Sequence, residues 1–236
     1  MRLKALSLCL LMLVLSLSVT INSLNGEVEN PTFEETVEPL NVISPLIELN
    51  EPGFQEGSIF TNSTLSSGFS HTCAILDDGS VSCWGSNGDG ELGDGTTVSK
   101  SIPIPTSSLG DGRTAVAISS GVVHNCVILD DGNVSCWGDN RDGQLGDGTT
   151  IPERYSPVPT LSLGDGRTAI AISSGNDYTC AILDNGSVSC WGQNHNGQLG
   201  DGTTDVRNTP TQIASLGSGR TPVAIAAGSG HTCTIL

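Results

Sequence analysis

Six cysteines stand in three pairs, and the members of each pair are ten residues apart across a turn that contains Asp-Gly or Asn-Gly. Such dipeptides between alternating apolar runs are typical of β-hairpins. If Asp77-Asp78-Gly79 forms a three-residue loop, position 73 faces position 83, and cysteines facing each other at a non-hydrogen-bonded site can bridge. The spacing therefore predicts three disulfides, one per hairpin: Cys73–Cys83, Cys126–Cys136 and Cys180–Cys190.

Metal binding and redox chemistry are the alternatives for these cysteines. Zinc is usually held by more closely spaced pairs whose four ligands converge, and a redox catalyst uses C-x-x-C, which is absent. No metal and no cofactor are predicted. A fourth copy of the motif begins at Cys233 and stops at Leu236. We therefore expect Cys233 to be unpaired by truncation and the sequence to be a C-terminally truncated fragment.

The histidines and acids follow the repeats. His71, His124 and His231 share one repeat position, which Tyr178 takes in the third copy. This favours a packed ring over a catalytic or metal-binding one.

The acidic loop with Asp89, Glu91 and Asp94 first suggests calcium. Only the last of these acids persists in the other copies, as Asp147 and Asp201. We expect a glycine turn in which this aspartate accepts backbone N–H bonds, with a calcium- or glycan-binding module as an alternative. No lipase elbow, P-loop or dinucleotide motif is present, so no catalytic residues and no enzyme are predicted.

The elements that must position these residues are short strands in tandem repeats. The repeats span 66–118, 119–172 and 173–225, with a truncated fourth over 226–236. A period near 50 is typical of propellers and solenoids, and each unit holds three to four strand patterns. Ser101-Ile-Pro-Ile-Pro suits only an edge. We predict an all-β fold of propeller blades, with a structural core at Trp84, Trp137, Trp191, Leu92, Leu145 and Leu199.

The N-terminal region differs from the repeats. Arg2 and Lys4 precede an apolar run, so residues 1–23 are predicted to be a secretory signal peptide, with an uncleaved membrane anchor as the alternative. Residues 24–65 contain eight glutamates, several prolines and no Lys or Arg, which indicates an acidic linker. The formal net charge of −16 argues against nucleic acid as a partner. We expect a secreted or cell-surface protein.

One stretch carries a family resemblance: Gly-x-x-His-Thr-Cys-Ala-Ile-Leu-x-x-Gly-x-Val-x-Cys-Trp-Gly, continued by Asn-x-x-Gly-x-Leu-Gly-Asp-Gly. It matches residues 68–95, 121–148 and 175–202. The stretch resembles the repeat of the regulator of chromosome condensation, and we expect the secreted bacterial or archaeal type. The resemblance implies a seven-bladed β-propeller, of which this chain holds a partial arc, and it does not imply the founding member's function.

Function is sought where the repeats differ, because loops on a rigid scaffold usually carry binding. The candidate binding residues are Lys100, Arg141, Glu153, Arg154, Tyr155, His195 and Arg207. We expect a non-catalytic scaffold for an extracellular protein or surface ligand, with an inhibitor-like role as the specific version. Nucleotide exchange on a small GTPase, as in the founding member, is the alternative.

Overall fold

The computed structural model describes residues 64–236. The predicted signal peptide and nearly all of the predicted acidic linker lie outside the described residues. Strands are the regular elements of the described chain. None of its residues belongs to a helix long and apolar enough to cross a membrane.

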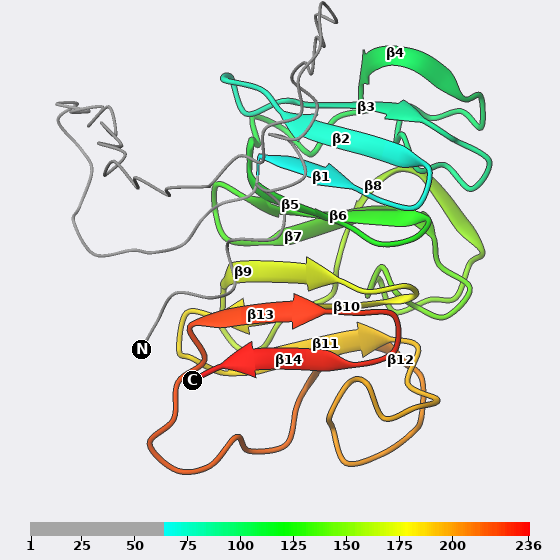
Figure 1. The fold of residues 1–236 in the computed structure, drawn as a ribbon. Helices are drawn as coiled ribbons and strands as arrows, with labels where there is room; N and C mark the ends of the chain where they lie inside the picture. Colours follow the sequence, from blue (N-terminus) through cyan, green and yellow to red (C-terminus); the bar gives the residue numbers. More distant parts are fainter. Residues whose placement is uncertain (1–63) are drawn as a thin grey trace, which may run out of the picture. The chain divides into compact units, whose positions relative to one another are not determined.

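The strands form three antiparallel sheets of four and one of two, and each sheet uses strands that follow one another in sequence (Figure 1). The first sheet contains β1 (Leu65–Ser67), β2 (His71–Ile75), β3 (Val81–Gly85) and β4 (Lys100–Pro105). The second contains β5 (Ala115–Ser120), β6 (His124–Leu129), β7 (Val134–Asp139) and β8 (Glu153–Pro159). The third contains β9 (Ala169–Ser174), β10 (Tyr178–Leu183), β11 (Val188–Gly192) and β12 (Arg207–Gln212), and the last pairs β13 (Ala224–Ala227) with β14 (Thr232–Ile235).

The sheets divide the chain at different points from the sequence repeats. Strand β5 pairs with β6, so residues 115–118, which end the first repeat, belong to the second sheet. The proline-containing segments form β4, β8 and β12, each with one strand neighbour. Proline is tolerated there because it removes a backbone donor that a central strand needs.

The second and third strands of each four-stranded sheet form the predicted hairpin. In the first sheet Leu76 N–H donates to the Ser80 carbonyl across the turn at 2.8 Å, and Cys73 lies opposite Cys83. The structure contains all three expected disulfides, each with a Cα–Cα distance of 4.1 Å. Each disulfide contributes roughly 2–3 kcal/mol to the free energy of unfolding under a loop-entropy model. Cys233 is free and exposed.

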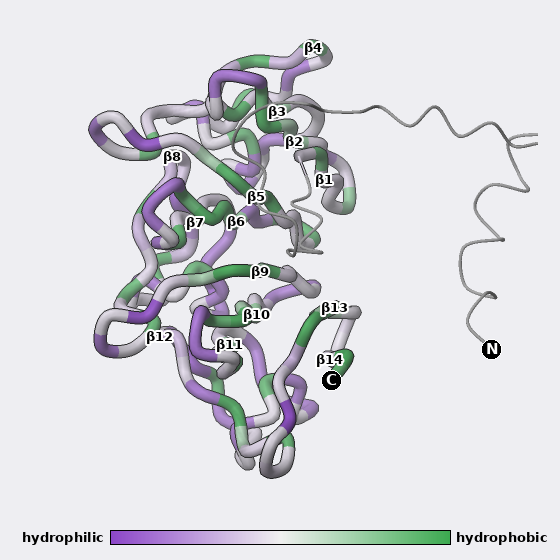
Figure 2. Tube along the Cα trace, turned by 90° about the vertical axis from the view of Figure 1, so that its left-hand side faces the viewer, coloured by the Kyte–Doolittle hydropathy of each residue, from purple (hydrophilic) through white to green (hydrophobic). Residues whose placement is uncertain are grey.

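Neighbouring sheets contact each other through their first strands. Strand β5 lies against β1 and β2, β9 against β5 and β6, and β13 against β9 and β10. Figure 2 shows β5, β9 and β13 as apolar segments, whereas many of the connecting loops are hydrophilic. Backbone hydrogen bonds to serine hydroxyls tie adjacent sheets together: Ser120 N–H donates to Ser66 Oγ and Ser174 N–H to Ser119 Oγ, both at 2.9 Å.

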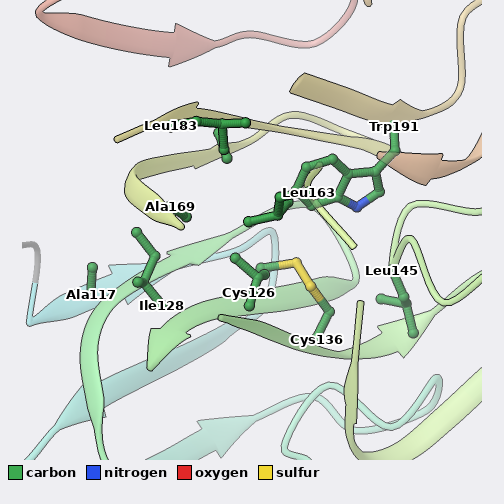
Figure 3. Close-up of a cluster of buried hydrophobic side chains, with 11 residues drawn as sticks. Ala117, Cys126, Ile128, Cys136, Leu145, Leu163, Ala169, Leu183 and Trp191 are labelled. Carbon is green, nitrogen blue, oxygen red and sulfur yellow. A yellow bond between two sulfur atoms is a disulfide. The ribbon is translucent and has the colours of Figure 1, made fainter. Parts of the chain in front are cut away.

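The core is built between sheets as well as within them. The Cys126–Cys136 disulfide and Ile128 of the second sheet share one buried cluster with Leu183 and Trp191 of the third (Figure 3). Trp137 takes the same place between the first and second sheets, where it is fully buried beside Leu92. The indoles on the third strands of the second and third sheets, Trp137 and Trp191, thus pack against the preceding sheet.

Not every residue expected in the core is equally buried. Leu92, Leu145, Leu199, Trp137 and Trp191 are at most 1% exposed. Trp84, expected beside them, is only partly buried, because among the described residues no sheet precedes the first one to cover it.

Candidate functional site

Three of the seven candidate binding residues meet where the loops of the first and second sheets adjoin. Arg141 follows β7, while Glu153 and Tyr155 stand at the start of β8. They adjoin Asp89 and Gly90, which belong to the loop after β3. A site at this junction therefore uses residues from two sheets.

Arg141 is the centre of a charged group at this junction. Its Nη2 lies 2.9 Å from Asp89 Oδ1 and 2.7 Å from Glu153 Oε1, and its Nε lies 3.4 Å from Asp139 Oδ1. We call Asp89, Asp139, Arg141 and Glu153 the junction cluster. Its carboxylates accept hydrogen bonds from Arg141 and from Gln144. The cluster therefore offers both an exposed guanidinium and carboxylates to a charged group.

The strand register forces two acids of the junction cluster together. Asp139, the last residue of β7, faces Glu153, the first residue of β8, and like charges at facing positions destabilise a sheet. Burial raises the pKa of the Asp139 carboxyl, and the charge of Asp89 acts in the same direction, against the Gln144 hydrogen bond and the Arg141 charge. The hydrogen bond to Glu153, with the charges of Asp139 and Asp89, raises the pKa of Arg141. The guanidinium is therefore the counter-ion that this register requires.

Tyr155 borders the junction cluster. Its side chain is 41% exposed, and its backbone carbonyl accepts a hydrogen bond from Gly95 N–H at 2.8 Å. A Cβ added at Gly90 would come within 2.7 Å of the Tyr155 ring, so glycine allows the two loops to approach. A half-exposed tyrosine beside charges has the character of an interface hot spot.

Two of the remaining candidates hold their own loops. Arg154 lies 2.6 Å from Asp147 Oδ2, and Arg207 lies 2.7 Å from Asp201 Oδ2. Although burial opposes it, hydrogen bonds from Thr203 and Arg207 lower the pKa of Asp201 to about 2. These arginines therefore act within their own sheets.

The last two candidates lie apart from the junction cluster. Lys100 is partly buried and stands opposite Gly85, the register position that Arg154 and Arg207 occupy opposite Gly138 and Gly192. His195 is exposed and has no hydrogen-bond or ion-pair partner within residues 64–236.

The aspartate that persists in every glycine loop accepts backbone hydrogen bonds as expected. Thr96, Thr149 and Thr203 N–H groups each donate to their aspartate at 2.9 Å. The Glu91 carboxylate is bonded separately, by Asp89 N–H at 2.9 Å and Ser86 Oγ at 3.2 Å.

From the sequence, Asp89 was considered only within its own glycine loop, and Asp139 and the asparagine that organises each loop were overlooked. Asn87 is fully buried; its Nδ2 donates to Asp94 Oδ1, and its Oδ1 accepts from Leu92 N–H. Its presence in every copy, as Asn140 and Asn194, was the available signal. For Asp139 the available signal was variation between the copies, because Ser86 and Gln193 occupy its position in the other two.

Comparison with known proteins decides the family. The model of the regulator of chromosome condensation (RCC1) repeat matches residues 78–128, 131–182 and 185–235. A second model of the same repeat matches 63–91, 115–144 and 169–198. The chain belongs to the RCC1 repeat family. Its four-stranded sheets are β-propeller blades, numbered 1 to 3 below in chain order.

Relatives with RCC1 repeats cover most of the chain. The ultraviolet-B receptor UVR8 of Arabidopsis thaliana is 33% identical over 172 residues, which are 72% of this chain and 38% of the receptor. The human E3 ubiquitin-protein ligase HERC2 is 33% identical over 166 residues, 70% of this chain and 3% of the ligase. The chain thus spans less than half the length of these relatives.

Solved structures share the RCC1 propeller fold. Prp20p from Saccharomyces cerevisiae has a TM-score of 0.62 at 20% identity, over 72% of this chain and 42% of Prp20p. Prp20 in its complex with Kap60 gives a TM-score of 0.63 at 19% identity, over 71% and 40% of the two chains. At this identity the likeness establishes the fold.

Proposed function

We propose that this chain is a non-catalytic scaffold that binds a protein partner outside the cell, through the loop face at the junction of blades 1 and 2. The observation that carries the proposal is the asymmetry of this face. Arg141, Glu153 and Tyr155 differ from their counterparts in the other blades, yet they gather beside Asp89 from the neighbouring blade. A requirement of the repeat itself would recur in each blade.

The composition of this face suits recognition of a protein. Arg141 and Tyr155 belong to the residue types enriched in interface hot spots. The Arg141 side chain is 56% exposed and Tyr155 is 41% exposed, and both residues contact blade 1. Pre-positioned side chains lose less conformational entropy when a partner binds.

Relatives and disulfides support the kind of partner and the compartment. The yeast propeller Prp20p is described through its binding to Gsp1p and histones, and in complex with Kap60. Three disulfides within single blades suit an oxidising compartment. An inhibitor of an extracellular protein is the specific version of this proposal.

Site-specific photo-crosslinking tests the proposal. A photoreactive residue replaces Tyr155 in the full chain, which is then incubated with the medium and intact surface of the producing cells. The control places the same group at Asn185, an exposed residue of the β10–β11 turn at the opposite end of the strands. We expect one protein to crosslink from position 155 and not from 185.

Variants then test the residues named. Tyr155→Ala and Arg141→Ala should each weaken capture of that protein tenfold or more, the size of effect expected for a hot spot. Arg207→Ala, at the loop of blade 3, should leave capture unchanged. Equal crosslinking from both ends of the strands, or capture insensitive to Tyr155→Ala and Arg141→Ala, contradicts the proposal.

A further inference from the structure

The junction cluster contains more negative charge than its one guanidinium neutralises. Asp89, Asp139 and Glu153 each offer a carboxylate oxygen, and these oxygens all lie within 4.8 Å of one another. Two oxygens on opposite sides of a calcium ion are about 4.8 Å apart, since Ca²⁺–oxygen distances are about 2.3–2.6 Å. The three acids therefore stand at the spacing of a shared cation, and with Arg141 the net charge of the group is −2.

Asp139 is the buried acid of the junction cluster, and one of its carboxylate oxygens lacks a hydrogen-bond donor. Its side chain is only 6% exposed. Oδ2 accepts a hydrogen bond from Gln144 Nε2 at 2.7 Å, whereas Oδ1 is buried and accepts none. Oδ1 faces the junction cluster, where the nearest cation is Arg141 Nε at 3.4 Å, too far for a good hydrogen bond. A buried carboxylate oxygen without a donor is costly, and an ion at the centre of the cluster would satisfy it.

The acids are not there to serve the repeat. At the junction of blades 2 and 3 the matching positions hold Asp142, Gln193 and Val206, so one acid remains of three. Gln193 Nε2 simply donates to Asp142 Oδ2 at 3.3 Å there. Two blades thus pack against each other without a cluster of three acids. The acids between blades 1 and 2 are therefore not explained by blade packing.

Arg141 can leave the centre of the group. Its side chain is 56% exposed, so its guanidinium can move outward without unpacking the core. Calcium takes six to eight oxygens in adaptable geometry, whereas magnesium demands a tighter octahedron. Three carboxylates offer up to six oxygens, and water can complete the open side.

We propose that the junction cluster is a calcium site in which Asp89, Asp139 and Glu153 bind Ca²⁺ and Arg141 is the built-in competitor that holds the acids together without the ion. This set shares only Asp89 with the calcium loop considered from the sequence, because Glu91 and Asp94 accept hydrogen bonds within their own turn. Extracellular calcium modules bind with Kd values of about 10⁻⁴–10⁻³ M, and we expect this range.

Calcium titration of the purified full chain tests the proposal without any partner. Thermal unfolding in 10 mM CaCl₂ should occur at a higher temperature than in 10 mM MgCl₂ at equal ionic strength. Isothermal titration with CaCl₂ should give a binding heat that Glu153→Gln removes; Glu153 is partly exposed, so the variant keeps its core. Asp139→Asn should remove the same heat.

The decisive variant is Arg141→Gln. Removing the competitor should tighten calcium binding at least fivefold, and calcium should restore the stability lost with the ion pairs. The matched control is Arg207→Gln, whose arginine contacts Asp201 and Thr203 within its own loop; it should gain no affinity. If Arg141→Gln is destabilised and calcium neither binds nor restores it, Arg141 is only a structural clamp and the proposal is wrong. That result leaves the partner-binding proposal intact, because no partner takes part in these measurements.

Discussion

At the scale of single residues, the histidines show how a motif that suggests chemistry can serve packing. His124 is fully buried, and its Nε2 lies 3.0 Å from Thr179 Oγ1. Because the Thr179 hydroxyl donates to the Gln144 carbonyl, the imidazole must donate from Nε2. Nδ1 is then the unprotonated nitrogen, buried without a partner. Protonation would place a charge there, and burial, helped by the charge of His71, lowers the pKa of His124 to about 3.

Acid should therefore destabilise the fold through His124. The unfolded chain takes up this proton near pH 6.5 and the folded chain only near pH 3. The contribution of His124 is thus complete above pH 6.5 and is lost as the pH falls towards 3, by up to about 1.4 kcal/mol per pH unit. His124→Tyr, the residue that blade 3 carries as Tyr178, should reduce the loss between pH 7.5 and 4.5 by about 2–3 kcal/mol in urea unfolding.

The exposed His195 supplies the control for that measurement. His195→Tyr makes the same chemical change in a loop without partners among the described residues, and it should leave the pH dependence unchanged. Equal acid sensitivity of wild type and His124→Tyr would show that other groups, such as the turn aspartates, account for the loss.

At the scale of elements, the glycine loop is the device that joins one blade to the next. The loop of blade 2 places Gly146 against the indole of Trp191 in blade 3. Gly146 has a φ of +68°, and a Cβ there would lie 2.8 Å from Trp191 Nε1 and 2.9 Å from Cδ1. The indole is fully buried, so it has no room to move away.

Gly146→Ala should therefore lower the free energy of unfolding by more than the left-handed backbone conformation alone would. Gly166 has nearly the same φ, +65°, but open space at the Cβ position. Gly166→Ala should therefore cost about 1 kcal/mol for the left-handed conformation, and Gly146→Ala about 2 kcal/mol more, from overpacking. Urea unfolding of both variants measures the difference. Equal losses would mean that the Trp191 contact is easily relaxed.

The elements were largely predictable from the sequence, whereas the junction cluster was not. Cysteines ten residues apart on either side of Asp-Gly predict a hairpin, its register and its disulfide, because all three depend only on local geometry. Asp89 and Glu153 are 64 residues apart in the chain, and they meet because two blades pack side by side. Side-chain contacts between blades depend on how each loop crosses to its neighbour, which no period in the sequence encodes.

At the scale of the whole molecule, stability should vary along the chain because each blade contacts only its neighbours. Strands β6, β7 and β10 are buried at every residue, whereas β2 and β3 are partly exposed at three of five residues and β14 is exposed at two of four. Opening blade 2 must break packing against both blade 1 and blade 3. Opening blade 1 breaks packing against one described blade.

Amide hydrogen exchange should follow this order. At neutral pH, peptic peptides from β6 and β10 should exchange most slowly, those from β2 and β3 faster, and those from β14 fastest, because local opening needs less free energy where fewer interfaces are lost. Reducing the disulfides should speed exchange in every blade while preserving the order, since each blade holds one disulfide. Uniform protection from β2 to β14 would contradict this, because it would show that the blades open only together, as one cooperative unit.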